Sequence, residues 1–327
     1  MPKESLISVV IPLYNEEEVV GETYKRTSSV LDSIKTPCEI IFVDDASADR
    51  TLEVLSGIAA MDKRVRVISF SRNFGHQAAL TAGLDHARGD AVITMDGDLQ
   101  HPPELIPELL GKWREGFEVV YTIREYDEGE GFFKKATSSF FYSIINSLAQ
   151  IRIPANAADF RLYDRKVVEG LKSLRERNRF LRGLSAWVGF RQTGVNYRAA
   201  RRLAGTSKYS VRKMIRFAID GITSFSIFPL KLSIYLGFVV SLLSFLYLIY
   251  VLYVRLIAGR GVPGWASTTI AMLFLGGVQL IAIGILGEYI GRIYEEIKAR
   301  PPYIVTRKIG FSGGGGEGSE GGEGGEG

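Results

Sequence analysis

Two carboxylates separated by one glycine follow a short apolar segment of the chain. Asp96 and Asp98 come directly after residues 91–95, AVITM, and Gly97 lies between them. Glycine lets the backbone turn tightly, so both side chains can face one cavity. At about 4 Å two unpaired carboxylates repel each other by about 4 kcal/mol, whereas a bound divalent cation attracts both. The spacing therefore predicts a site for a hard cation that bridges diphosphate oxygens, although an ordinary turn rich in Asp and Gly has the same residues.

Polar residues also follow two earlier apolar segments. The first segment, an expected strand over residues 6–13, runs into Tyr14 and Glu16, and the second, over residues 39–43, runs into Asp45. In an open α/β sheet, ligands bind at the carboxyl ends of the parallel strands. We therefore expect these side chains to meet the two carboxylates of the first motif in one crevice.

Strand-like and helix-like segments alternate through the first part of the chain. Further strands are expected at residues 65–70, 91–95 and 118–122, and helices at residues 16–33 and 77–87. Alternation of this kind predicts an α/β fold with a mostly parallel sheet and helices on both of its faces.

Four segments resemble the motifs of one enzyme family. They are VVIPLYNEEE from residue 9, VDDASADRT from residue 43, SRNFGHQAALTAGLDHARGD from residue 71 and MDGDLQHPPE from residue 95. The chain thereby resembles the glycosyltransferases of family 2, which have a GT-A, Rossmann-like fold. Its resemblance to the polyprenyl-phosphate sugar transferase branch of that family, the GtrB-like proteins, covers residues 5–310.

This resemblance implies two overlapping sets of site residues. Those expected to bind the nucleotide sugar, with UDP as the nucleotide, are Pro12, Tyr14, Glu16, Asp45 and Asp96. Those expected to bind Mg²⁺ or Mn²⁺ are Asp96, Asp98 and Gln100, with Asp98 as the direct ligand. The chain departs from the family pattern at Ala46, where glycine is common.

A further segment, IPANAADFRLYDR from residue 153, resembles the D-F-R-L segment of the same branch. It places Asp159 and Arg161 at the matching positions and Ala158 where glycine is usual. With Asp98, these two are the expected catalytic residues. Asp159 is the candidate base. An acceptor phosphate monoester has a second pKa of about 6 and needs little deprotonation at pH 7, so orienting the acceptor is an alternative role. A buried Asp that caps a turn is a third reading.

Phosphate groups on the leaving group and on the acceptor call for cations. Arg124 follows a predicted strand, and the segment RLAGTSKYS from residue 202 resembles the R-x-A-G-x-S-K-Y segment of the family. The expected phosphate-binding residues are therefore Arg124, Arg202, Ser207 and Lys208. The planar fork of Arg and the point charge of Lys both suit phosphate oxygens.

Composition and missing motifs exclude several other classes of protein. The formal net charge is +4, but the cations crowd residues 198–231, beside apolar segments, which favours anionic lipid or phosphate over nucleic acid as a partner. Cys38 is the single cysteine, so neither an intrachain disulfide nor a thiolate zinc site can form. His76, His86 and His101 do not suggest a ligand cluster. The chain has no P-loop, no G-x-G-x-x-G after the first strand and no nucleophile elbow, and no cleaved signal sequence is expected.

Two long uncharged segments occupy the last third of the chain. Residues 232–254 and 266–287 contain no formal charge and would form helices about 35 and 33 Å long, against a hydrocarbon core of about 30 Å. The short segment between them is rich in glycine. A transmembrane helical hairpin is the prediction, and two buried helices of a soluble protein are the alternative.

The distribution of Lys and Arg around these segments predicts their orientation. The linking loop has two cations, Arg255 and Arg260. The flanks have seven, which are Arg212, Lys213, Arg216, Lys231, Arg292, Lys298 and Arg300. By the positive-inside rule both termini are cytoplasmic, in a bacterial inner membrane.

We expect seven segments in all. They are a cytoplasmic catalytic domain at 1–205, interfacial amphipathic helices at 206–231, transmembrane helices at 232–254 and 266–287 joined by an extracytoplasmic loop at 255–265, a cytoplasmic segment at 288–311, and a disordered Gly/Glu tail at 312–327.

Together these observations predict a metal-dependent, inverting transferase that moves a sugar from a nucleotide sugar to a polyprenyl phosphate such as undecaprenyl phosphate. The resemblance implies that the sugar is a hexose, with glucose as first choice. A processive polysaccharide synthase and a non-catalytic nucleotide-sugar-binding membrane scaffold are the alternatives. Gly287 and Gly291 allow close helix packing, so self-association through the transmembrane helices is also expected.

Overall fold

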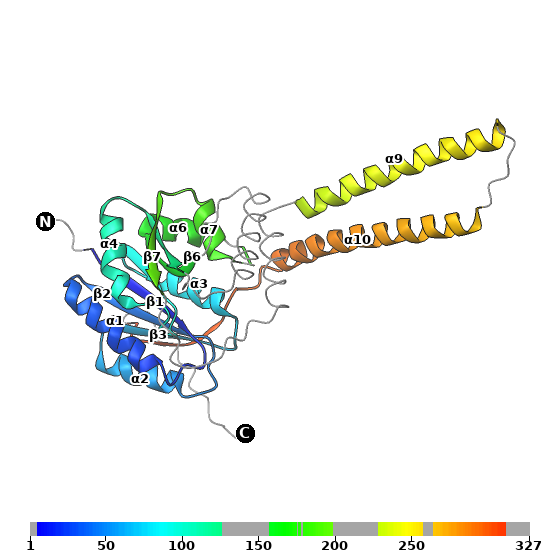
Figure 1. The fold of residues 1–327 in the computed structure, drawn as a ribbon. Coiled ribbons are helices and arrows are strands. Elements are labelled where there is room, and N and C mark those ends of the chain that lie inside the picture. Colours follow the sequence, from blue (N-terminus) through cyan, green and yellow to red (C-terminus); the bar gives the residue numbers. More distant parts are fainter. Residues whose placement is uncertain are drawn as a thin grey trace, which may run out of the picture.

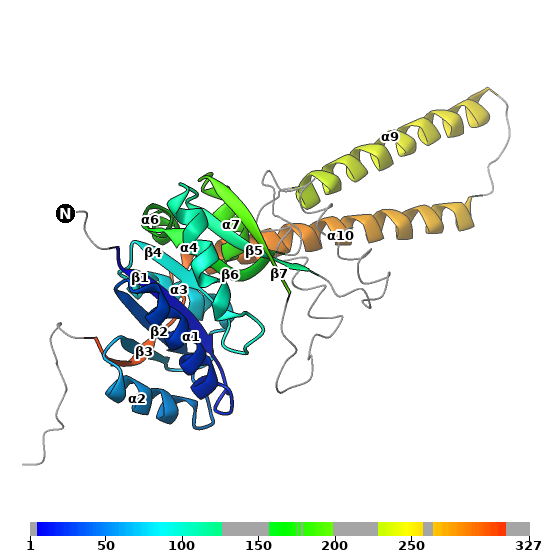
Figure 2. The same ribbon diagram turned by 60° about the vertical axis from the view of Figure 1, so that its left-hand side comes forward.

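A computed structural model of the protein describes residues 5–125, 157–198 apart from 175 and 178, 228–257 and 264–311. These residues form an α/β body from which two long helices extend side by side (Figures 1 and 2). The strands are β1 (Ile7–Leu13), β2 (Cys38–Asp44), β3 (Val65–Phe70), β4 (Ala91–Thr94), β5 (Val119–Glu125), β6 (Ala157–Asp164), β7 (Gln192–Arg198) and β8 (Val305–Ile309). The helices are α1 (Val20–Ile34), α2 (Thr51–Met61), α3 (His76–His86), η1 (Pro103–Leu105), α4 (Ile106–Arg114), α6 (Arg165–Ser173), α7 (Leu181–Trp187), α9 (Phe228–Leu256) and α10 (Trp265–Ile297).

All eight of these strands belong to one mixed sheet, in the order β7-β5-β6-β4-β1-β2-β3-β8. Four pairings are parallel, those of β1 with β2, β1 with β4, β2 with β3 and β5 with β7. Three are antiparallel, those of β3 with β8, β4 with β6 and β5 with β6. The expected α/β fold with a mostly parallel sheet is confirmed.

Alternate residues of β1 point into two separate cores, as the period of two in a strand requires. Val9 and Ile11 pack with residues of α1, α2 and α4, whereas Val10 packs with residues of α3, α6 and α7. The sheet is thus covered on both faces. This explains why the central strands are almost uninterrupted runs of apolar residues.

The observed elements differ from the expected ones mainly at their ends. The helix expected from residue 16 begins at Val20 and follows a turn over residues 17–19, in which the N–H of Val19 donates to the carbonyl of Glu16 at 3.0 Å. Strand β8 was not expected. It lies in the predicted cytoplasmic segment 288–311, and it returns the chain to the sheet edge beside β3.

The two long helices include both predicted spans. Helix α9 has 29 residues and α10 has 33, and their apolar segments Phe228–Tyr247 and Phe274–Ile297 are long enough to cross a membrane and are not buried in the protein. Most of the expected interfacial region, residues 206–227, lies outside the described residues, as do the predicted tail at 312–327 and most of the linking loop.

Candidate active site

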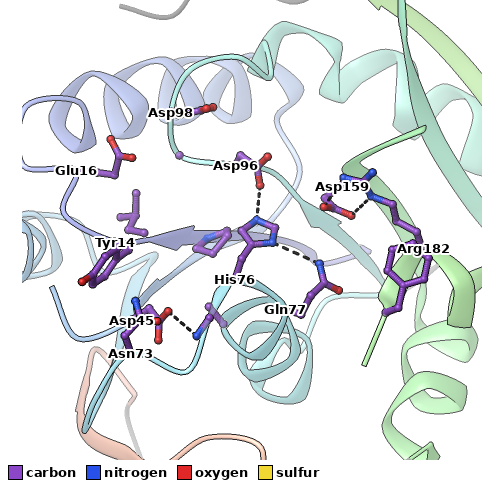
Figure 3. A pocket seen from close by; sticks show the side chains of 16 residues that line it. Tyr14, Glu16, Asp45, Asn73, His76, Gln77, Asp96, Asp98, Asp159 and Arg182 are labelled. Carbon is purple, nitrogen blue, oxygen red and sulfur yellow. Dashed lines mark hydrogen bonds and ion pairs between the residues drawn. The ribbon is translucent and has the colours of Figure 1, made fainter. Parts of the chain in front are cut away.

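A cavity of about 710 Å³ opens at the carboxyl ends of β1, β2 and β4. Figure 3 shows its side chains in three groups: Tyr14, Glu16, Asp45 and Asn73 at one end, Asp96, Asp98 and His76 in the middle, and Gln77, Asp159 and Arg182 at the other end. The described residues that line it are Pro12, Leu13, Tyr14, Glu16, Asp45, Asn73, Gly75, His76, Gln77, Ala79, Asp96, Gly97, Asp98, Asp159, Phe180 and Arg182.

The end that contains Tyr14 is built by the loops after β1 and β2. Asn15 adopts a left-handed backbone with a φ of 54°, and Tyr14 beside it is 48% exposed. The N–H of Asn15 donates to Ser47 Oγ at 2.9 Å, and Asn15 Oδ1 accepts from the N–H of Ala48 at 2.8 Å. These two hydrogen bonds fix the loops against each other and leave the aromatic ring available to a ligand.

Asp45 is held by the loop that leads into α3. Its Oδ1 accepts from the N–H of Phe74 at 2.7 Å and its Oδ2 from the N–H of Gly75 at 2.8 Å. Burial of the carboxyl outweighs these two hydrogen bonds and raises the pKa of Asp45. Asp45 therefore lines the cavity and also fixes the loop at Phe74 and Gly75 that forms part of the cavity wall. Ala46, which follows it, has a φ of 57°, the left-handed conformation that glycine adopts more easily.

The turn at residues 96–98 is held by contacts with Leu13, Thr23 and His101. A Cβ on Gly97 would lie 2.3 Å from Leu13 Cδ2 and 3.3 Å from the carbonyl oxygen of Pro12, so a larger residue would force the Leu13 side chain to shift. The carbonyl of Gly97 accepts from Thr23 Oγ1 at 2.9 Å, and the N–H of Asp96 donates to His101 Nδ1 at 3.0 Å. This packing explains why glycine separates the two carboxylates.

His101 lies beneath this turn as a structural support. Its ring stacks on Phe160, with the ring centroids 5.4 Å apart and the planes at 25°, and meets the ring of Tyr197 edge-on. The side chain is buried and does not line the cavity.

The two carboxylates of the motif have different surroundings. Asp96 Oδ1 lies 2.7 Å from His76 Nε2, and this contact outweighs burial and raises the pKa of His76. Asp98 Oδ1 accepts from the N–H of Gln100 at 3.1 Å. Gln100, an expected metal ligand, does not line the cavity.

A metal would need ligands from outside the protein as well. Among the described residues no three His, Cys, Asp or Glu side chains are gathered closely enough to hold a metal ion by themselves. Magnesium is commonly held by one or two carboxylates together with substrate phosphates and water. Asp96 and Asp98, facing one cavity, fit that donor set.

The opposite end of the cavity is dominated by one ion pair. Arg182 donates from Nε to Asp159 Oδ1 and from Nη2 to Asp159 Oδ2, both at 2.7 Å. Burial alone would raise the pKa of Asp159, but the guanidinium outweighs it and holds that pKa well below the usual range of a carboxyl. A group that binds a proton so weakly is a poor general base.

Arg161 lies behind this ion pair rather than in the cavity. It is 1% exposed, and it donates from Nε to the carbonyl of Ala158 and from Nη1 to Ser185 Oγ. The expected catalytic contact of Arg161 with substrate does not fit this position. The residue supports the strand that presents Asp159.

The expected phosphate-binding cations are not brought into the described cavity. Arg124 lies on β5, where its side chain is exposed, and it does not line the cavity. Arg202, Ser207 and Lys208 lie outside the described residues.

Sequence reasoning missed several lining residues, among them Asn73, His76, Gln77, Phe180 and Arg182. The first three lie in the segment SRNFGHQAALTAGLDHARGD, whose resemblance to the family was a usable signal. Arg182 has no comparable signal, because it is one of several arginines between residues 175 and 182, and its partner Asp159 lies 23 residues earlier.

Two family models match the chain. The model described as Glycosyl transferase family 2 matches residues 8–171, and the model described as GtrB C-terminal hairpin matches residues 228–293. The first includes every lining residue except Phe180 and Arg182, and the second includes most of α9 and α10.

Several curated proteins are similar along almost their whole length. An uncharacterized glycosyltransferase, YkcC, of Bacillus subtilis is 49% identical over 95% of this chain and 96% of its own. A bactoprenol glucosyl transferase of Shigella phage SfV is 46% identical over 92% of this chain and 98% of its own. Among solved structures, glucosyl-3-phosphoglycerate synthase from Mycobacterium tuberculosis, in complex with Mn²⁺, UDP and glucosyl-3-phosphoglycerate, is 22% identical over 68% of this chain and 80% of its own, with a TM-score of 0.44.

Proposed function

This chain belongs to glycosyl transferase family 2 and ends in a GtrB C-terminal hairpin, and from that premise we propose that it transfers glucose from UDP-glucose to a polyprenyl phosphate such as undecaprenyl phosphate. The observation that carries the proposal is the similarity to bactoprenol glucosyl transferases. Three of them, from Shigella phages SfII, SfV and SfX, are 44–46% identical over 92% of this chain, a length that includes the hairpin as well as the catalytic domain.

The donor occupies the end of the cavity that contains Tyr14. The exposed ring of Tyr14 stacks on the uracil base, and Glu16 and Asp45 accept hydrogen bonds from the base or the ribose hydroxyls. Pro12 also lines the cavity and belongs to the proposed donor site. This arrangement directs the diphosphate toward Asp96 and Asp98.

Asp96 and Asp98 would hold Mg²⁺ or Mn²⁺ together with the diphosphate. Asp98 would be the direct ligand, and Asp96 is oriented by its contact with His76. When bound, the cation would supply Lewis-acid stabilisation of the negative charge that develops on the departing UDP. Arg202, Ser207 and Lys208 belong to the same proposal as further phosphate contacts.

The reaction is an in-line displacement at the anomeric carbon. An oxygen of the acceptor phosphate forms a bond to C1 of glucose as the bond from C1 to the diphosphate oxygen breaks. The products are UDP and polyprenyl phosphoglucose, in which the configuration at C1 is inverted. The attacking phosphate is already largely anionic at pH 7, because its second pKa is about 6. No strong base is required, which agrees with the tight pairing of Asp159 by Arg182.

Helices α9 and α10 form the membrane anchor in this proposal. Both are long enough to span, they lie side by side, and their loop has fewer cations than their flanks, so the α/β body faces the cytoplasm of a bacterial cell. Residues 1–205 form the catalytic domain. Anchoring places the cavity close to a lipid-borne acceptor and raises the rate of encounter.

A transfer assay tests the proposal. The purified full-length chain is incubated with undecaprenyl phosphate, Mg²⁺ or Mn²⁺ and one radiolabelled donor at a time: UDP-glucose, UDP-galactose, UDP-N-acetylglucosamine or GDP-mannose. We expect label from UDP-glucose in the organic phase, and no such label with Asp98→Ala. Label from another donor would overturn the choice of glucose, and no label from any donor would overturn the transferase proposal for this acceptor.

A further inference from the structure

Arg182 stands apart from the other charged residues of the cavity. The described lining residues include five carboxylates, Glu16, Asp45, Asp96, Asp98 and Asp159, and Arg182 is the one Lys or Arg among them. An acceptor phosphate with a charge of about −1.5 to −2 would be repelled by such a lining unless a cation met it. The divalent cation of the proposed reaction serves the departing diphosphate, and among the described lining residues Arg182 is the cation that can meet the attacking phosphate.

We infer that Arg182 binds the phosphate of the acceptor, and that Asp159 positions the Arg182 guanidinium for this contact. The inference rests on the proposed function, whose acceptor is a polyprenyl phosphate. It assigns Asp159 a positioning role instead of the role of general base.

The ion pair has the geometry that this role requires. Asp159 binds the edge of the guanidinium formed by Nε and Nη2, so that Nη1 lies on the side away from this carboxylate. An Arg held in this way presents a planar, permanently charged fork to phosphate oxygens without losing further side-chain freedom when the phosphate arrives. About 25% of the Arg182 side chain remains exposed.

Asp159 is itself fixed to a rigid part of the sheet. Its carbonyl accepts from Thr94 Oγ1 at 2.6 Å, which joins β6 to β4 at the strand end that precedes Asp96. On the other side, Gln77 Oε1 accepts from the N–H of Leu181 at 3.0 Å and fixes the first residue of α7. Arg182 is therefore held from both the strand and the helix.

The Arg182 end of the cavity is also the end tied to the membrane hairpin. Arg177 Nε lies 2.8 Å from Glu295 Oε2, and the N–H of Arg177 donates to Glu296 Oε2 at 3.1 Å. Both glutamates belong to the last turn of α10. Figure 1 shows α7 beside the end of α10 at which the helix approaches the α/β body. A lipid phosphate that arrives along the hairpin would reach Arg182 before it reached the Tyr14 end.

Kinetics of the full-length chain with a short acceptor, farnesyl phosphate, test the inference. Arg182→Ala should raise the acceptor KM by about 10- to 100-fold, as expected for loss of a hydrogen bond to a charged group, while the affinity for UDP with Mn²⁺, measured by calorimetry, stays within about twofold. Added guanidinium should restore part of the lost rate. Arg26→Ala is the matched control, because Arg26 also donates from Nε and Nη2 to the two oxygens of one carboxylate, that of Glu104, away from the cavity.

Asp159→Asn provides a second measurement that a purely structural role would not reproduce. This variant should raise the acceptor KM more than it lowers kcat, and it should keep the acid limb of the pH profile near the second pKa of the acceptor phosphate. Disappearance of that limb would identify Asp159 as the base and overturn the positioning role.

The remaining outcomes separate this inference from the proposed function. If the wild-type chain glucosylates farnesyl phosphate and Arg182→Lys, checked for folding by thermal unfolding, weakens UDP binding but not the acceptor KM, Arg182 belongs to the donor site and the inference is wrong. If the wild-type chain transfers glucose to no prenyl phosphate, the proposed function itself fails.

Discussion

The ring of Tyr303 stacks on the ring of Phe70, with the centroids 5.1 Å apart and the planes 13° from parallel. Tyr303 follows the hairpin, and Phe70 ends β3, three residues before Asn73 in the cavity wall. The same junction contains a hydrogen bond from the N–H of Ser71 to the carbonyl of Ile304 at 3.0 Å and the pairing of β8 with β3. The chain that leaves the hairpin is thus built into the sheet that carries the site.

Truncating Tyr303 should destabilise this junction. Tyr303→Ala removes the stacked ring and should lower the free energy of unfolding by about 2–4 kcal/mol. Tyr303→Phe keeps the ring and loses the hydrogen bond to Asp85, which should cost about 1 kcal/mol. Thermal unfolding of the full-length chain in detergent shows whether Tyr303→Ala lowers the melting temperature more than Tyr303→Phe does. Equal melting temperatures for Tyr303→Ala and the wild type would show that the junction does not contribute to stability.

Ala46→Gly should stabilise the protein. A non-glycine residue in the left-handed region costs about 1–2 kcal/mol, and Ala46 has a φ of 57°. The greater freedom of glycine in the unfolded chain offsets part of the gain, so a net stabilisation of about 0.5–1 kcal/mol is expected. A rise in melting temperature of about 2–4 °C would agree, and a fall would show that the turn carries no strain.

Gly83→Ala should destabilise the protein although alanine favours helices. A Cβ at this position in α3 would lie 2.0 Å from Val10 Cγ1 on β1, and overpacking of a core costs about 1–3 kcal/mol. Gly57→Ala, in α2, is the control, because a Cβ there meets nothing within 4 Å and should stabilise the helix by about 1 kcal/mol. In a Val10→Ala background the cost of Gly83→Ala should largely disappear, and an unchanged cost would contradict the steric explanation.

The central strands could be predicted because they are continuous apolar runs buried on both faces. Strand β8 could not, because its sequence, VTRKI, has only two apolar residues, and its three central side chains are exposed. Its position is decided by backbone pairing with β3 and by Tyr303, whose hydroxyl donates to Asp85. These two residues are 218 positions apart in the sequence. Pairing at a sheet edge leaves little trace in the hydrophobic pattern.

The candidate site divides in a similar way. Tyr14, Glu16, Asp45, Asp96 and Asp98 could be predicted to converge because each follows β1, β2 or β4, which run parallel to one another in the sheet. The ion pair at the other end depends on how α7 packs against β6, which no local spacing specifies.

Removal of metal should abolish transfer if Asp98 binds a divalent cation. Chelation by EDTA should stop the reaction, and added Mg²⁺ or Mn²⁺ should restore it. Asp98→Asn keeps the size of the side chain but loses its charge, so it should need a higher metal concentration for half-maximal rate and should lower kcat by about 10²-fold or more. Glu104→Gln, which changes a surface carboxylate paired with Arg26, should keep the wild-type metal requirement. Full activity in EDTA would rule out a dissociable metal.

Breaking the contact between Arg177 and Glu295 should change kinetics more than stability. The two side chains are 30% and 46% exposed, and ion pairs of this kind contribute about 0–1 kcal/mol, so Arg177→Ala should hardly shift the melting temperature. The same contact holds the segment that leads to Arg182 against the last turn of α10. Arg177→Ala and Glu295→Ala should therefore each raise the acceptor KM by a few-fold, and the double variant should be no worse than the more affected single variant, because both remove one contact. Additive effects in this cycle, or equal changes in donor and acceptor KM, would show that α10 does not position the acceptor end of the cavity.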